Sequence, residues 1–249
     1  VGSEMCIRDR PSPDGKITAA QVAEAYEAHI HNDSFEHMVQ PKMIYISNPT
    51  EVGTIYSKAE LTALSETCHK YGLYLFLDGA RLGYGLAAPD NDLTLPEIAA
   101  LCDVFYIGGT KVGALFGEAV VIKNPELAQD FRYLIKQNGG MLAKGRLLGL
   151  QFDALFTDGL YQVISAHAIA MAEKLREAFT AKGYTYLAPN RTNQIFVIVP
   201  DAHLAKISEQ FEYSYDQRID ATHSCVRFCT GWATREENVD ALIRCVEKL

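Results

Sequence analysis

Leu73-Tyr74-Leu75-Phe76-Leu77-Asp78-Gly79 is the stretch that decides the fold. Its apolar residues run without alternation and stop at Asp-Gly, which is typical of a strand buried on both faces of a sheet. A helix is predicted just before it, because Ser57 and Glu60 have the spacing of a capping box and Gly72 ends the helical pattern. The stretch therefore predicts one strand of a βαβ unit.

The same alternation of helix and strand extends in both directions from this stretch. Thr18 is expected to cap an earlier helix, and Thr94 a later one. Further strands are predicted at residues 43–46, 103–107 and 119–122. We therefore predict an α/β fold, in which a largely parallel sheet carries helices on both faces.

The pattern changes towards the C-terminus. Residues 125–181 are predicted to be mainly helical, and a final helix is predicted to be capped by Thr234 and Glu237. Strand-like runs lie between them, at residues 184–187, 195–199 and 225–229. This indicates a second, smaller α+β unit joined to the first through long helices.

Residues 1–10 have neither a strand nor a helix period and no apolar core for a signal peptide. They resemble a translated adapter or assembly scar, so we predict a non-native leader there. The alternative is a flexible native N-terminus.

The composition is that of an ordinary globular protein, with 48% hydrophobic and 22% charged residues among 249. Lys and Arg number 23 against 31 Asp and Glu, and the net charge of -8 argues against nucleic acid or an anionic membrane as partner. No apolar run approaches the ~20 residues of a membrane span. Six cysteines, of which only Cys225 and Cys229 lie close in sequence, predict a reduced cytoplasmic protein without a metal site.

Three predicted strands are followed by polar residues, namely Asn48, Asp78 and Lys111. Ligands of parallel α/β sheets bind outside the carboxyl ends of the strands, so an amide, an acid and a base are expected to converge. Pyridoxal phosphate needs such a set, because its aldehyde takes a lysine amine and its ring nitrogen withdraws electrons only when protonated. Taken singly, Asp78 could be a helix cap and Lys111 a solvated loop residue. Their coincidence at successive strand ends favours pyridoxal phosphate as the cofactor.

Nucleotide binding is disfavoured by the glycine spacing. The glycines at 79, 83 and 85 do not match the dinucleotide fingerprint, and Gly108-Gly109-Thr110-Lys111 lacks the longer loop of a phosphate-binding P-loop.

Leu77-Asp78-Gly79-Ala80-Arg81-Leu82-Gly83, followed by Asp103-Val104-Phe105-Tyr106-Ile107-Gly108-Gly109-Thr110-Lys111, resembles a known family. It is similar to the low-specificity L-threonine aldolases of the β-eliminating lyase group, which are fold type I pyridoxal-phosphate enzymes. The resemblance runs from about Ile17 to the C-terminus. It implies that residues 11–140 are the C-terminal part of a cofactor-binding large domain, and that residues 141–249 are connecting helices and a small domain.

The resemblance also implies roles for individual residues. Lys111 would form the Schiff base with the cofactor, Asp78 would pair with the ring nitrogen, and Arg81 would approach the ring hydroxyl oxygen. Thr110 would lie near the phosphate. Arg227 would clamp the substrate carboxylate, for which a planar guanidinium is well suited.

One segment departs from the threonine aldolase pattern. Asn48-Pro49-Thr50-Glu51-Val52-Gly53 resembles the Asn-Pro-x-Gly stretch of aminotransferases, in which the Asn also reaches the ring oxygen. Residues 137–144 resemble a Gly-Gly-x-Met segment that such enzymes place near the cofactor, often across a dimer interface; a solvated helix-starting loop is the alternative.

The resemblance implies cleavage of L-threonine, or of a related β-hydroxy-α-amino acid, to glycine and an aldehyde. An aminotransferase or β-eliminating lyase on the same fold stays open because of Asn48, and so does an inactive fragment that lacks part of the active site. A homodimer or homotetramer is implied as well. The Gly-rich phosphate loop and the ring-stacking residue of the family have no match before Ile17.

Overall fold

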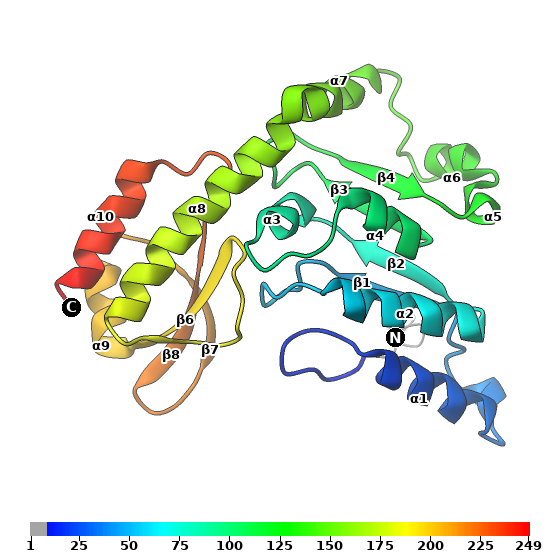
Figure 1. Cartoon of the computed structure of the whole chain (residues 1–249), viewed down its shortest axis with the longest axis horizontal. Coiled ribbons are helices and arrows are strands. Elements are labelled where there is room, and N and C mark those ends of the chain that lie inside the picture. Colours follow the sequence, from blue (N-terminus) through cyan, green and yellow to red (C-terminus); the bar gives the residue numbers. More distant parts are fainter. Residues whose placement is uncertain (1–8) are drawn as a thin grey trace.

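The first sheet of this computed structural model has four strands, in the spatial order β1 (Met43–Ser47), β2 (Tyr74–Asp78), β3 (Val104–Gly108) and β4 (Glu118–Ile122) (Figure 1). The structure describes residues 9–249, so the predicted leader lies outside the described residues except for its last two. β1, β2 and β3 are parallel, and β4 is antiparallel to β3. The sheet is therefore largely parallel, as predicted.

Three helices of this unit begin at the residues that their capping boxes predict. These are α1 (Ala19–Ile30), α2 (Lys58–Tyr71) and α4 (Leu95–Leu101), capped by Thr18, Ser57 and Thr94 respectively. In each box the cap side chain accepts from the main-chain N–H three residues later, while a Gln or Glu side chain accepts from the N–H of the cap residue. A short 3-10 helix, η2 (Phe35–His37), separates α1 from β1.

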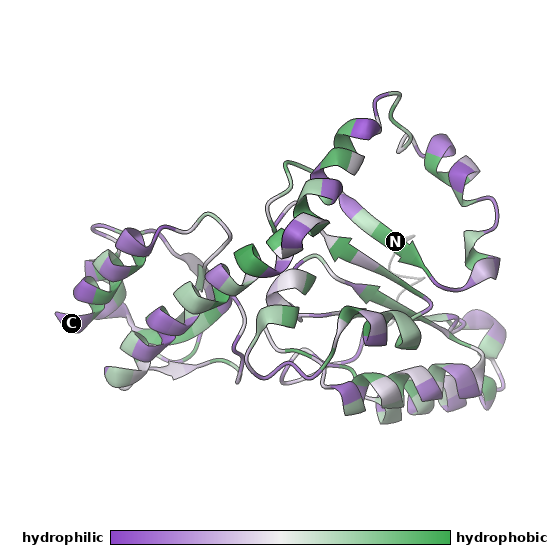
Figure 2. Ribbon diagram, turned by 45° about the horizontal axis from the view of Figure 1, so that its top comes forward, coloured by the Kyte–Doolittle hydropathy of each residue, from purple (hydrophilic) through white to green (hydrophobic). Residues whose placement is uncertain are grey.

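The two faces of the first sheet differ in burial. Side chains alternate between the faces of a strand, and one set lies in the hydrophobic core: Ile46, Leu75, Leu77, Phe105 and Ile107. The opposite set is more open, with Tyr45 54% and Val120 51% exposed. Figure 2 shows the hydrophobic strands of this sheet, with helices on one side that alternate between hydrophobic and hydrophilic residues. In residues 9–249, the main core of this unit is therefore built on one face of the sheet.

The helical region after β4 consists of several pieces. They are α5 (Pro125–Ala128), α6 (Phe131–Gln137), α7 (Arg146–Phe156), the 3-10 helix η3 (Thr157–Gly159) and α8 (Leu160–Ala181). α8 has 22 residues and runs from the first unit to the second (Figure 1). Another helix, α3 (Leu82–Ala87), follows β2 and packs on α8, where Gly83 N–H donates to the Tyr161 hydroxyl at 3.0 Å.

The second unit is a four-stranded antiparallel sheet in the order β5-β6-β8-β7. Its elements are β5 (Thr185–Tyr186), β6 (Gln194–Pro200), α9 (Asp201–Ile207), β7 (Ser214–Arg218), β8 (His223–Cys229) and α10 (Glu236–Glu247). α8 and α10 cover one face, and a separate hydrophobic cluster that includes Leu175, Phe179 and Val226 fills the space between them. This confirms the predicted small α+β unit.

The predicted cap of the last helix is wrong. α10 begins at Glu236 after Arg235, and no side chain caps it. The Thr234 hydroxyl instead accepts from Gly231 N–H at 2.8 Å, because the chain turns back directly after β8. A hydroxyl that closes this turn is not available to the helix.

Two loops join the units directly. Asn190 Nδ2 donates to Val52 O at 2.8 Å, and the Thr192 hydroxyl donates to Gly53 O at 2.8 Å. The loop after β1 is thereby attached to the segment that leads into β6. No helix in the described part of the chain has the length and apolarity to cross a membrane.

Candidate active site

The ends of β2 and β3 bring the predicted acid and base to the same edge of the sheet. Asp78 is the last residue of β2, and Lys111 follows β3 by three residues. The two strands are parallel, so their carboxyl ends meet there. Gly108 N–H donates to Gly79 O at 2.8 Å and ties the two ends together.

Glycine is required at this junction because the two main chains approach too closely for a side chain. A Cβ at Gly79 would lie 1.9 Å from Tyr106 O, and one at Gly108 would lie 2.2 Å from Ala80 O. These glycines of the sequence motif therefore serve close packing of the strand ends, and they place Asp78 beside the lysine loop.

The Asp78 carboxylate is surrounded by donors. The Tyr45 hydroxyl donates to Oδ2, Ala80 N–H donates to Oδ1 at 3.0 Å, and the nearby Tyr106 hydroxyl also favours the charged carboxylate. Burial raises the pKa of Asp78, but these hydrogen bonds and the charge of Lys111 outweigh it and hold the pKa below its ordinary value. Asp78 is therefore an anion at neutral pH.

Lys111 is exposed, and a hydrogen bond to its carbonyl holds its main chain in place. The buried Tyr84 donates its hydroxyl to Lys111 O, and the same hydroxyl accepts from Trp232 N–H at 3.3 Å. The lysine loop is thus linked through one phenol to the turn that follows β8 in the small unit.

The charges of two arginines from different units both act on Cys229, at the end of β8. Burial raises the pKa of the Cys229 thiol, and the positive charges of Arg227 on β8 and of Arg81 before α3 both lower it. Arg227 donates from Nη1 to Gln194 Oε1 at 3.3 Å, and its guanidinium lies 5.9 Å from the ring centre of Phe196. Its Nε is buried without a hydrogen-bond partner. The charges of two arginines from different units therefore reach the end of β8.

The remaining two predicted residues have main-chain partners in this structure. Asn48 is 3% exposed and its Oδ1 accepts from Tyr56 N–H at 3.0 Å, so this oxygen holds the loop after β1. Thr110 is exposed, and its hydroxyl is 3.4 Å from Gly117 O.

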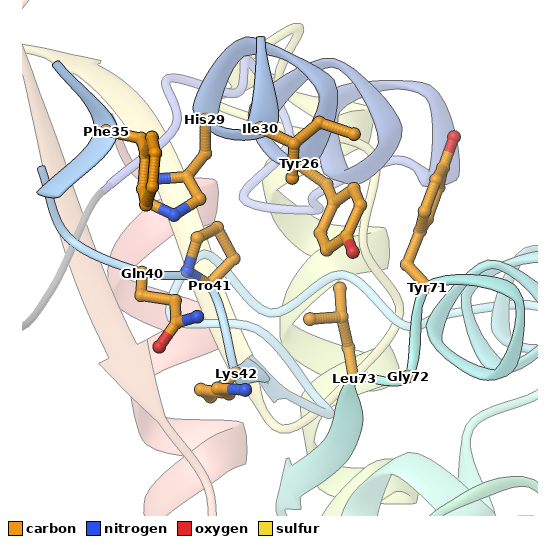
Figure 3. Close-up of a pocket in the computed structure, with 10 residues that line it drawn as sticks. All are labelled: Tyr26, His29, Ile30, Phe35, Gln40, Pro41, Lys42, Tyr71, Gly72 and Leu73. Atoms are coloured by element: carbon orange, nitrogen blue, oxygen red, sulfur yellow. The ribbon is translucent and has the colours of Figure 1, made fainter. Parts of the chain in front are cut away.

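Neither of two further pockets gathers the predicted residues. One of about 260 Å³ lies where β1 and β2 begin, at the opposite end of the strands from Asp78, and is lined mainly by α1 and by the segments before the strands (Figure 3). A second, of about 340 Å³, lies in the small unit and contains Arg227 alone among them.

Sequence reasoning missed Tyr45, Tyr84 and Tyr106 as members of this site. The signal for Tyr45 and Tyr106 was strand alternation: Ser47 pairs with Asp78, so a residue two positions before Ser47 shares the face of Asp78. No sequence signal marked Tyr84, because its role depends on where β8 ends.

The comparisons with known proteins agree with the predicted fold and the predicted resemblance. A sequence model of the family described as Beta-eliminating lyase matches residues 3–202. Low specificity L-threonine aldolase from Pseudomonas sp. (strain NCIMB 10558) is 32% identical over 235 residues, which are 93% of this chain and 65% of that protein.

Solved structures give the same result. Leishmania major threonine aldolase superimposes with a TM-score of 0.92 at 43% identity, over 96% of this chain and 69% of that chain. Sphingomonas wittichii serine palmitoyltransferase, at 15% identity, shares the fold with a TM-score of 0.63 over 91% of this chain and 58% of that chain. The chain thus spans about two thirds of the length of its relatives, 65% in the case of the Pseudomonas protein. It belongs to the Beta-eliminating lyase family.

Proposed function

We propose that the protein is a pyridoxal-phosphate-dependent aldehyde-lyase that cleaves L-threonine, or a related β-hydroxy-α-amino acid, into glycine and an aldehyde. The observation that carries this proposal is the meeting of Asp78 and Lys111 at neighbouring strand ends. The names of the Pseudomonas and Leishmania relatives support the reaction.

The donor set fits the cofactor. The charge of Lys111 reaches Asp78, yet among residues 9–249 the two side chains form no direct ion pair. An anionic carboxylate can hold a proton on a ring nitrogen, and an exposed lysine can take an aldehyde. The cations of Arg81 and Arg227 suit the phenolate oxygen of the ring and the carboxylate of an amino acid.

Each residue then has a task. When bound, pyridoxal phosphate supplies an electron sink for the electron pair that Cα keeps after its bond to Cβ breaks. Asp78 would hold the proton at the ring nitrogen, and Lys111 would hold the cofactor through its amine. Arg81 and Asn48 would bind the ring oxygen, and Thr110 would bind near the phosphate.

Arg227 orients the substrate. Its guanidinium would hold the carboxylate so that the Cα–Cβ bond stands across the plane of the ring, the direction in which the bond can break. The cation–π contact of the guanidinium with Phe196 and its hydrogen bond to Gln194 would help to orient it before substrate arrives.

The test uses the intact protein, expressed from its complete open reading frame. Wild type is expected to take up pyridoxal phosphate, with the change in cofactor absorbance that follows capture by a lysine, and to release glycine and acetaldehyde from L-threonine. Lys111→Ala should lose both, whereas Lys123→Ala, a change after β4, should keep both. Full turnover by Lys111→Ala would exclude the proposed site.

The same assay separates the alternatives. Amino transfer to a keto acid without aldehyde release would indicate an aminotransferase, which the Asn48-Pro49 stretch suggested. Release of pyruvate and ammonia from serine would indicate a β-eliminating lyase.

A further inference from the structure

Three aromatic rings lie side by side on the open face of the first sheet. Tyr45 on β1 and Phe76 on β2 are stacked, with ring centroids 5.2 Å apart and planes 9° from parallel. Tyr106 on β3 lies on the other side of Phe76, at 6.1 Å and a tilt of 57°. Phe76 precedes Asp78 by two residues, so all three rings share the face of that carboxylate.

Both outer tyrosines lie beside Asp78. The Tyr45 hydroxyl donates to Oδ2 and Ala80 N–H donates to Oδ1 at 3.0 Å, while Tyr106 on the neighbouring strand is near enough for the carboxylate to raise the pKa of its phenol. The strand on either side of β2 thus contributes one phenol. Because Phe76 fills the space between the rings, neither tyrosine can turn inward without displacing it.

We propose that Tyr45 and Tyr106 are positioning residues, which clamp the Asp78 carboxylate and aim it at the ring nitrogen of the cofactor. The proposal rests on the proposed function. A carboxylate has lone pairs enough to accept these three donors and one more at the sheet edge. The clamp restricts the carboxylate to the orientation in which its free lone pairs point out of the strand ends.

The clamp also keeps Asp78 ionised, because every one of its donors favours the charged form. The phenols themselves stay protonated: burial and the adjacent carboxylate raise the pKa of Tyr45 to about 12, and burial raises that of Tyr106 further. The other ionisable groups whose charges reach this cluster are Lys111, Glu51 and Glu118.

The first test needs no cofactor. The intact apoprotein is labelled with aspartate carrying carbon-13 in its carboxyl group, and the signal missing from Asp78→Asn identifies Asp78. Tyr45→Phe and Tyr106→Phe keep the stacked rings and remove one donor each, so the pKa of Asp78 should rise in each variant and further in the double variant. Tyr74→Phe, on the same face at the start of β2, is the matched control and should leave it unchanged. An Asp78 pKa that stays at the wild-type value in the double variant overturns the clamp.

The second test measures binding of pyridoxal phosphate to the same proteins. Each Tyr→Phe change should raise the dissociation constant by about three- to tenfold, the loss expected for one ordinary hydrogen bond, because the tyrosines act on the cofactor only through Asp78. The pH below which the cofactor is released should rise by about half a unit to one unit, which simple loosening of the fold would not cause. Unchanged affinity and release pH in the double variant would contradict the positioning role. If wild type binds no pyridoxal phosphate, the proposed function fails, and the carboxyl titration still decides the clamp.

Discussion

The hydroxyl of Tyr84 in α3 donates to the main-chain carbonyl of Lys111. The same oxygen accepts from Trp232 N–H, and Tyr84 is only 1% exposed. One phenol thereby sets the position of the lysine loop relative to the strand that carries Arg227. The site is assembled across the two units by this contact.

Tyr84→Phe should therefore weaken both stability and activity. The change removes both hydrogen bonds of the phenol, which together contribute about 1–3 kcal/mol of unfolding free energy. Chemical denaturation measures the stability, and the kcat of the proposed threonine cleavage measures the activity. Tyr133→Phe is the control, since Tyr133 is 75% exposed. Equal stability of Tyr84→Phe and wild type would show that the phenol is not the link.

Gly79→Ala should prevent correct closure of the sheet edge. The new methyl group would lie 1.9 Å from Tyr106 O, a main-chain atom that cannot move without disturbing β3. We expect a loss of more than about 3 kcal/mol, or no folded protein. Gly149→Ala in α7 is the matched change: nothing lies within 4 Å of the added Cβ, and alanine favours a helix, so stability should rise by about 1 kcal/mol. Thermal unfolding of both variants distinguishes packing from a general intolerance of alanine.

Phe179→Ala should destabilise the small unit. Phe179 is fully buried in α8, and its ring centroid lies 5.5 Å from that of Phe228. Its removal therefore leaves a cavity that lowers the free energy of unfolding by about 3–5 kcal/mol. Val163→Ala on the same helix, at 63% exposure, should stay within about 0.5 kcal/mol of wild type. Denaturant titration followed by circular dichroism measures both, and similar midpoints would contradict the placement of α8 in this core.

Acid should remove a stabilising contribution of Asp78. Its pKa in the folded protein is below the ordinary value of 3.8, so the contribution is fully present above that pH and is lost as pH falls through the lower folded value. Asp78→Asn removes the carboxyl group that titrates. The stability difference between wild type and this variant should therefore be constant from pH 5 to 8 and shrink below about pH 4. A difference that does not change with pH would mean that Asp78 titrates alike in both states.

Local sequence patterns determined most of the secondary structure. Thr18, Ser57 and Thr94 begin three helices as their spacing predicts, because a capping box satisfies its donors within four residues and needs no distant partner. The strands that end before Asn48, at Asp78 and before Lys111 were equally predictable from the sequence. A short run of consecutive apolar residues is typical of a strand that is buried in a sheet. This also allowed the acid and base to be predicted as neighbours.

Elements that depend on distant contacts were not predictable in this way. β7 is exposed and polar along its whole length, and it is a strand only because β8 provides a ladder for it. α3 contains two glycines, which disfavour a helix, and it forms against Tyr161. Thr234 has the spacing of a helix cap but closes a turn onto Gly231 instead.

The sequence by itself determined the α/β fold, its two units and the placement of Asp78 and Lys111 at neighbouring strand ends, because these follow from periodicity and from the rule that parallel strands end at one edge. Only the tertiary structure decided how the site is supported. Tyr45 and Tyr106 reach Asp78 through strand register, and Tyr84 reaches Lys111 and Trp232 through the packing of α3 between the two units. Hydrogen bonds between residues far apart in sequence depend on the positions of whole elements, and no local pattern encodes those positions.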